Sequence, residues 1–246
     1  MFFQRCRSLL LAVVSVSMAA AGWPENADSG LSATLSAAQI VEQMQRHDQA
    51  RTQELRHYKT LRRYQVEYHG FSTTVAAKMD VEVNYDASLG KSLLIVAQSG
   101  SSFLLEKVLK RAVDSEKEAF QERGSIALTP ANYRFHLAGS DILAGRPAYI
   151  LDVEPLVASK FLYRGKIWVD ATDFALVKME TEPAKSPSFW ISRAVIHYKG
   201  TKTDGFWMPR RVESETRVRM GGTAVLTIDY GMYQIESSAP QLIGGS

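Results

Sequence analysis

The sequence is almost without cysteine. Its single cysteine, Cys6, precedes an apolar run near the N-terminus, so it is not placed as a lipidation cysteine. Once a leader that contains it is removed, the chain has no thiol. Disulfides, thiolate nucleophiles and cysteine-ligated metal sites are therefore excluded.

The chain also lacks a strong charge of one sign. Lys and Arg number 29 against 26 Asp and Glu, a formal charge of +3. Nucleic-acid binders ordinarily carry a basic patch and a higher pI, so no nucleic-acid partner is expected. Glycine (16) and proline (8) are too few for a collagen-like or low-complexity chain. The 46% of hydrophobic residues is ordinary for a globular protein.

Residues 1–21 have the pattern of a secretory signal peptide. Arg5 and Arg7 form a basic start, residues 9–16 are apolar, and Ala19–Ala21 provides a cleavage site of small residues. The apolar run is much shorter than the ~20 residues of a membrane span, which argues against the alternative of a transmembrane anchor. Cleavage would leave 27 basic and 26 acidic residues. We therefore expect export, with a periplasmic location.

A first helix is predicted after a lead, residues 22–34, that has no period and is expected to be flexible. Ser36 and Gln39 have the spacing of a capping box. The helix should run from there to about His57. Its apolar stripe is thin, which is typical of a helix that lies against a surface.

A second helix is predicted from Ser101 or Ser102 to Gly124. Apolar residues recur at helical spacing between these ends, and charged residues occupy the opposite face. The apolar positions are Leu105, Val108, Leu109, Ala112, Val113 and Phe120.

Strand patterns of period two fill most of the rest. Apolar and polar residues alternate in Tyr64–Tyr68 and Met79–Tyr85, so each strand should bury one face, as strands of antiparallel sheets do. Ser92–Ala97 is apolar throughout and is predicted to be a central strand. From Tyr133 onward only strands are predicted, at 133–138, 148–154, 161–170, 174–182, 189–198, 206–220 and 224–233. The turns between them are short, so consecutive strands should be antiparallel neighbours.

The predicted fold class is α+β and mainly antiparallel, with about ten strands in one sheet and two main helices. A sheet this wide must curl, close or split into two layers. Its interior could be filled by its own side chains, or left partly open as an apolar trough under a helical lid. No linker divides the chain, so one domain over 35–237 is expected, with a flexible tail at 238–246.

Signatures of catalysis are missing. The sequence has no G-x-S-x-G elbow, P-loop or G-x-G-x-x-G motif, and the histidines are scattered: His47, His57, His69, His136 and His197. No catalytic residue, metal or cofactor is therefore predicted. Asp170 and Asp173 flank a turn, where an acid/base pair and a plain turn role both stay open. The tryptophans Trp168, Trp190 and Trp207 could line a ligand pocket or pack a half-buried sheet.

Two segments carry a family resemblance. The first is Tyr163–Asp170 (YRGKIWVD), followed by Asp173, Lys178 and Glu180, and the second is the Gly205–Pro209 turn (GFWMP). Together with the signal peptide and the order of helices and strands, they make the chain resemble the LolA/LolB-like superfamily of outer-membrane lipoprotein-sorting proteins. The resemblance implies an unclosed barrel, a single strongly curved sheet whose concave face the helices cover. It also implies a hydrophobic inner wall that takes acyl chains of lipoproteins.

The predicted function is that of a periplasmic lipoprotein-sorting or carrier protein, not an enzyme, which binds acyl chains in a hydrophobic cavity and passes them toward the outer membrane. The predicted cavity wall consists of apolar strand positions: Val66, Val81, Val83, Ile167, Val169, Val212, Val218, Leu226 and Ile228. The predicted lid consists of helix positions: Ile40, Met44, Leu105 and Leu109.

Predicted partners are an inner-membrane transporter and an outer-membrane acceptor, with the chain itself a monomer. Members of the superfamily also act as lipid-responsive regulators of envelope stress. The alternative function is therefore a periplasmic protein that senses lipids or lipoproteins and acts through a membrane partner.

Overall fold

The computed structural model describes residues 35–70, 72–186, 189, 191–219 and 221–237. The predicted signal peptide (1–21), the lead (22–34), the tail (238–246) and Trp190 lie outside the described residues. The helices are α1 (Ala37–Glu54), α2 (Ser102–Leu104), the π-helical segment η1 (Leu105–Leu109), α3 (Lys110–Gln121) and α4 (Arg123–Ile126). None of the described helices has the length and apolar character needed to cross a membrane.

All ten strands belong to one sheet, in the order β3-β2-β1-β10-β9-β8-β7-β6-β5-β4. Every neighbouring pair is antiparallel. The strands are β1 (Leu55–His69), β2 (Thr74–Asp86), β3 (Gly90–Gly100), β4 (Tyr133–Leu143), β5 (Arg146–Pro155), β6 (Tyr163–Asp170), β7 (Leu176–Pro183), β8 (Ile191–Thr203), β9 (Phe206–Val218) and β10 (Thr223–Ser237).

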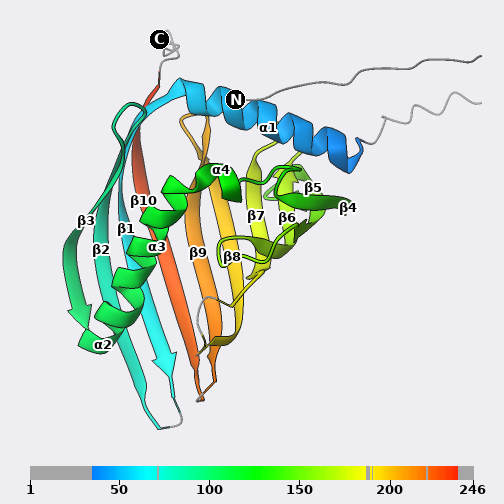
Figure 1. Ribbon diagram of the computed structural model, residues 1–246. Coiled ribbons are helices and arrows are strands. Elements are labelled where there is room, and N and C mark those ends of the chain that lie inside the picture. Colours follow the sequence, from blue (N-terminus) through cyan, green and yellow to red (C-terminus); the bar gives the residue numbers. More distant parts are fainter. Residues whose placement is uncertain (1–34, 71, 187–188, 190, 220, 238–246) are drawn as a thin grey trace, which may run out of the picture. The chain divides into compact units, whose positions relative to one another are not determined.

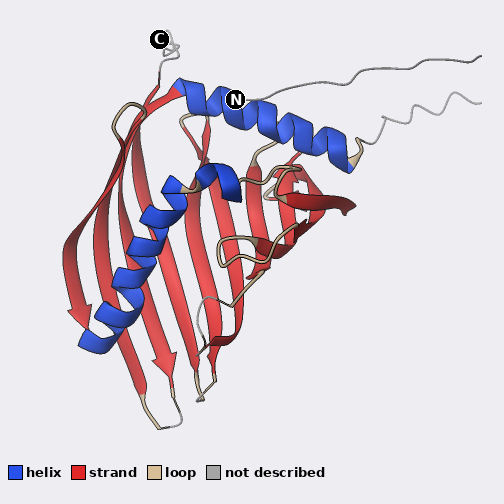
Figure 2. Ribbon diagram, viewed as in Figure 1, coloured by secondary structure: helices blue, strands red, loops and turns tan. Residues whose placement is uncertain are grey.

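The sheet does not close, because β3 and β4 remain at its two edges. The helices lie on one face, which we call the inner face, and the helical segment from α2 to α4 carries the chain from one edge strand to the other (Figures 1 and 2). This arrangement confirms the predicted fold class of a single unclosed antiparallel sheet with helices. The first and last strands, β1 and β10, pair with each other inside the sheet, two strands away from the β3 edge.

Helix α1 begins at the predicted capping box. The Ser36 backbone N–H donates to Gln39 Oε1 at 2.9 Å, and the Gln39 N–H donates to Ser36 Oγ at 3.3 Å. The helix ends at Glu54, three residues before the predicted His57. It stops there because Leu55 already pairs with Ser237 of β10, so the chain enters the sheet earlier than its apolar pattern indicates.

The second helical segment begins where predicted, with Ser101 as its N-cap. It is not a uniform α-helix, since residues 105–109 form a π-turn, which holds more residues per turn. Four residues of this segment are buried against the sheet: Leu104, Leu105, Leu109 and Val113. The α3 helix ends at Gln121, and the short α4 follows.

The prediction that Ser92–Ala97 forms a central strand is wrong. These residues belong to β3, an edge strand, where Leu94 is 62% exposed and Val96 is 50% exposed. An unbroken apolar run is typical of a strand buried on both faces. Here only the inner face of β3 is near a helix, since η1 and α3 both contact the strand.

Two apolar clusters form the core on the inner face. The first lies between β1, β2 and the segment α2–η1–α3, and includes Tyr64, Val66, Met79, Val81, Val83, Leu109 and Val113. The second lies between the strands β4–β6 and α1, and includes Ile40, Val41, Met44, Leu151, Ile167 and Val169. Each helix therefore covers one side of the sheet. Strands β9 and β10 also contribute to the first cluster, and residues of β7 pack against the second.

Replacing Leu109 by alanine should test the contribution of the π-turn to the first cluster. Leu109 is fully buried, so Leu109→Ala should lower the free energy of unfolding by about 2–5 kcal/mol. Urea titration followed by circular dichroism would measure it. Leu94→Ala, at the exposed edge, is the matched control and should change it by less than about 0.5 kcal/mol. Equal losses in the two variants would contradict this account of the core.

Candidate functional site

The predicted wall residues fall into two groups. Five of them are fully covered: Val66, Val81 and Val83 lie in the first core cluster, and Ile167 and Val169 lie in the second. The predicted lid residues pack in the same clusters, with Leu105 and Leu109 in the first and Ile40 and Met44 in the second. The other four wall residues, Val212, Val218, Leu226 and Ile228, lie on β9 and β10 and are half-buried.

Three of these positions, Val212, Leu226 and Ile228, belong to the incompletely covered middle of the inner face, which we call the central floor. Val218 lies further along β9, where it pairs with Ile191. Its register is fixed by the strand pairing: Met179, Tyr198, Val212 and Ile228 form one row across β7–β10, and Thr181, Ile196, Ser214 and Leu226 form the next. Tyr230 follows Ile228 on the same face of β10. These nine residues define the central floor, and all but Thr181 are only half-buried.

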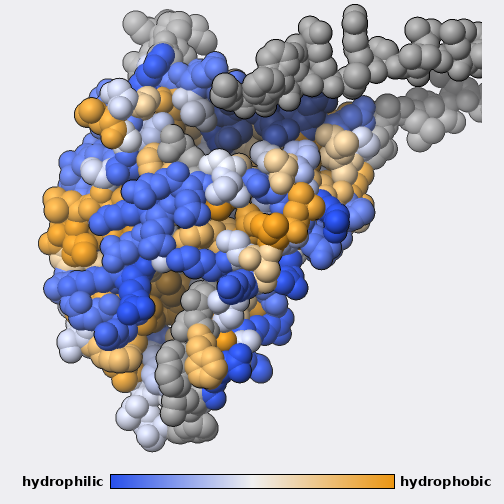
Figure 3. Space-filling view, viewed as in Figure 1, coloured by the Kyte–Doolittle hydropathy of each residue, from blue (hydrophilic) through white to orange (hydrophobic). Residues whose placement is uncertain are grey.

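Apolar surface is visible from the inner side. In the space-filling view it appears on both sides of the hydrophilic outer surface of α3 (Figure 3). The connection between β5 and β6 also reaches α3, since Lys160 Nζ lies 2.9 Å from Glu118 Oε2. Both side chains are about half exposed, and exposed ion pairs contribute little stability. This link between the two sides of the inner face is therefore weak.

A pocket of about 590 Å³ lies at the α1 end of the inner face. We call it the rim pocket. It is formed by α1, the 127–129 segment, the β6–β7 turn and the β8–β9 turn, and its lining combines apolar residues (Met44, Leu128, Phe174, Leu176, Phe206 and Trp207) with polar ones (His47, Asp48, Arg51, Glu54, Asp173 and Asp204). Its volume and mixed lining are ordinary for a pocket that binds a small molecule.

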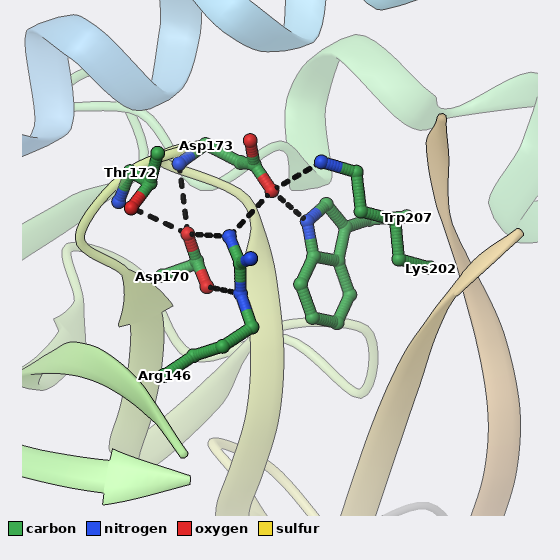
Figure 4. Close-up of polar contacts among 6 residues, drawn as sticks. All are labelled: Arg146, Asp170, Thr172, Asp173, Lys202 and Trp207. Carbon is green, nitrogen blue, oxygen red and sulfur yellow. Dashed lines mark hydrogen bonds and ion pairs between the residues drawn. The ribbon is translucent and has the colours of Figure 1, made fainter. Parts of the chain in front are cut away.

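A polar network fixes one wall of the rim pocket (Figure 4). Arg146 donates to both carboxylate oxygens of Asp170, at 2.6 and 2.8 Å, and to Asp173 at 2.9 Å. Lys202 Nζ and Trp207 Nε1 each donate to Asp173 at 2.8 Å. The network thus joins the β6–β7 turn to the start of β5 and to the β8–β9 hairpin.

The same network decides between the two roles left open for Asp170 and Asp173. Burial raises the pKa of each carboxyl, but Arg146 beside Asp170 and Lys202 beside Asp173 outweigh it, so both pKa values lie below the ordinary range. Asp170 also accepts hydrogen bonds from the backbone N–H groups of Thr172 and Asp173. Both carboxylates are ionised and occupied, which favours the turn role over acid/base chemistry.

Both described tryptophans pack against the sheet, and one of them also lines the pocket. Trp168 is buried with Ala148 and Val177 on the face of the sheet opposite Ile167 and Val169, and its Nε1 donates to Asp141 at 3.0 Å. Trp207 lines the rim pocket. Among the described residues, no group of three or more His, Asp or Glu side chains is placed to hold a metal ion.

Sequence reasoning missed a buried ionic cluster on the inner face. Arg62 of β1 and Lys91 of β3 both donate to Glu116 of α3, and the Tyr64 hydroxyl donates to Glu116 Oε2 at 2.7 Å. The available signal was the alternation in β1, which places Arg62 on the same face as Tyr64 and Val66. We name these four residues the ionic cluster, and it ties α3 to the two strands.

The charges of the ionic cluster set the state of its carboxylate. Burial alone would raise the pKa of Glu116, but Arg62 and Lys91 outweigh burial and lower it from 4.5 to about 2. Glu116 is therefore ionised at neutral pH. Its contribution to stability is complete above about pH 4.5 and is lost as the pH falls through about 2.

Comparisons with known proteins find solved structures of low similarity. No family model matches the chain, and no curated protein matches it. Among solved structures, a DUF1329 family protein from Desulfovibrio piger ATCC 29098 has a TM-score of 0.43 and 12% identity, covering 84% of this chain and 96% of its own. A putative outer membrane lipoprotein-sorting protein domain from Vibrio parahaemolyticus has a TM-score of 0.38 and 10% identity, covering 82% and 94%.

A LolA superfamily protein, NE2245 from Nitrosomonas europaea, has a TM-score of 0.33 and 12% identity, and covers 87% of this chain and 99% of its own. All three TM-scores are below 0.5, so these similarities say nothing about a ligand or a partner. The chain resembles these structures, and a proposal for its function rests on the chain's own residues.

Replacing Glu116 should test the ionic cluster. Glu116→Ala leaves Arg62 and Lys91 without their counter-charge, and we expect the free energy of unfolding at pH 7 to fall by about 3–5 kcal/mol. The free energy of unfolding of the parent should decline between pH 4.5 and pH 2, and this decline should be much smaller in the variant. Urea titration at each pH would measure both effects. Glu106→Ala, which removes an exposed ion pair on the same helical segment, is the control and should change little.

Proposed function

We propose that this protein is a periplasmic lipoprotein-sorting or carrier protein that holds acyl chains of lipoproteins or other lipids on the central floor. The observation that supports it is the half-burial of apolar side chains in the middle of the inner face, between two clusters that helices cover fully. An acyl chain on this floor would bury apolar side chains that α1 and α3 leave partly exposed. The chain would act by non-covalent binding, without catalysis, a metal or a cofactor.

In this proposal the nine predicted wall residues have different tasks. Val212, Val218, Leu226 and Ile228 would contact the acyl chain directly, because they are the accessible ones. Val66, Val81, Val83, Ile167 and Val169 would support it from beneath the helices, together with the lid residues Ile40, Met44, Leu105 and Leu109. The rim pocket would admit one end of the ligand.

The energetics suit a carrier. Burial of one methylene contributes about 0.8 kcal/mol, so a chain of about 16 carbons offers on the order of 10 kcal/mol. Association costs about 4–15 kcal/mol, so one chain would bind moderately and could be released. Moderate affinity is what transfer from an inner-membrane transporter to an outer-membrane acceptor requires.

A charged substitution on the central floor tests the proposal. The chain from residue 22 should bind a fluorescent acyl probe, and Leu226→Asp should weaken that binding by more than it lowers stability, because Leu226 is half-buried on the floor. Gln234→Asp is the matched control. It introduces the same charge at an exposed position of the same strand, opposite Lys59, and should leave probe binding unchanged.

Binding that falls only in proportion to folding would count against a ligand on the floor. A transfer assay separates the two functions that the resemblance implies. A carrier should move an acylated peptide from donor to acceptor vesicles, whereas a sensor that acts through a membrane partner should bind the peptide without moving it.

A further inference from the structure

The ionic cluster has one positive charge more than it has negative. Arg62 and Lys91 are both cations, and Glu116 is the one carboxylate of the described residues that bonds to either of them. Arg62 is 2% exposed, and the side chain of Lys91 is 11% exposed. An uncompensated buried charge is costly, so an additional anion in this place would be stabilised.

Arg62 also has a hydrogen-bond donor to spare. Its Nη1 donates to Glu116, but its Nε has no partner among the described residues and is shielded from solvent. The guanidinium lies over the ring of Tyr230, 4.5 Å from the ring centroid. Buried polar groups are nearly always paired, so this N–H indicates a missing acceptor.

The neighbouring part of the central floor offers further donors. Burial raises the pKa of Tyr230 well above its ordinary value, and it raises the pKa of Tyr198 to about 12. Both phenols are therefore neutral and keep their protons at neutral pH. The structure gives neither hydroxyl a hydrogen-bond partner among the described residues.

The hydrogen-bond donors lie between Arg62 and the rim pocket. Tyr198 lies on β8 in the same row as Val212 and Ile228, and Tyr230 follows Ile228 on β10. The charge of Arg51 on α1 opposes the rise in the pKa of Tyr198, and Arg51 also lines the rim pocket. Cationic and neutral donors thus run from the pocket to Arg62 across an apolar floor.

We propose that Arg62, Tyr198 and Tyr230 form a subsite for the anionic head of a long-chain amphiphile, a carboxylate or a phosphate, whose chain lies on Val212, Leu226 and Ile228. This inference rests on the proposed function and narrows it from acyl chains in general to lipids that carry a negative head. An anion would accept charge-assisted hydrogen bonds from the guanidinium and ordinary ones from the two phenols. It would also neutralise the excess charge of the ionic cluster.

The test compares ligands that share a 16-carbon chain and differ in the head group, which is either anionic or neutral. A saturated 16-carbon fatty acid, its methyl ester and the corresponding alkyl phosphate would each displace a neutral fluorescent acyl probe from the chain at pH 7. We expect both anions to bind at least about tenfold more tightly than the ester. The relative affinities of the acid and the phosphate would identify which of the two anions the subsite prefers.

Tyr198→Phe and Tyr230→Phe locate the subsite, because each removes one hydroxyl and keeps the ring. Each should reduce the preference for the anions about threefold or more without weakening the ester. Arg62→Gln should abolish the preference, and the two tyrosine variants carry the test if that protein does not fold. Tyr149→Phe, on the inner face of β5 against Phe174, is the control and should leave all affinities unchanged.

The outcomes distinguish a failure of the anionic subsite from a failure of the proposed acyl-binding function. If acid, phosphate and ester bind equally, the subsite is wrong and the acyl-binding proposal stands. If none of them binds, the proposed function itself fails. A preference for anions that survives both Tyr230→Phe and Arg62→Gln would place the anion elsewhere and overturn the assignment of these residues.

Discussion

The constraint on which the structure depends is the need to cover one wide apolar face with little helix. Ten strands form a single sheet, and among the described residues α1 and the α2–η1–α3 segment supply most of the helix that shields it. Each helical segment completes a core cluster at one side. The middle strands are left with half-buried apolar residues, and the proposed ligand site follows from this shortage of cover rather than from any special motif.

Polar groups fix the parts that surround this incomplete cover. Arg146, Asp170 and Asp173 hold the turns at the rim, where both carboxylates accept hydrogen bonds from cationic side chains. The ionic cluster holds α3 but leaves a donor and a charge unmatched. A buried ion pair gives little net stability, but removing one of its two partners is costly because the other charge stays buried. The buried, unpartnered Nε of Arg62 is what distinguishes the candidate binding subsite from the rim network.

Local sequence patterns predicted the elements well and their surroundings less well. Alternation identified the strands and their inner faces, and Ser36 with Gln39 marked the start of α1. The edge position of β3 could not be predicted, because an apolar run records side-chain chemistry and not the number of neighbouring strands. The partnership of Arg62 and Glu116 was equally hidden, since 54 residues separate them and only the path of the chain over the sheet brings them together.

The pairing of β1 with β10 has a consequence for how the molecule is made. Thr60 Oγ1 donates to the backbone oxygen of Gly231, 171 residues further along, so the middle of the sheet joins segments from near both ends of the described chain. Contacts so distant in sequence form late, because a long loop must close first. The hydrogen-bonded ladder between β1 and β10 therefore cannot form until β10 is present, so the two parts of the sheet that it joins stay separate until this last strand adds to them.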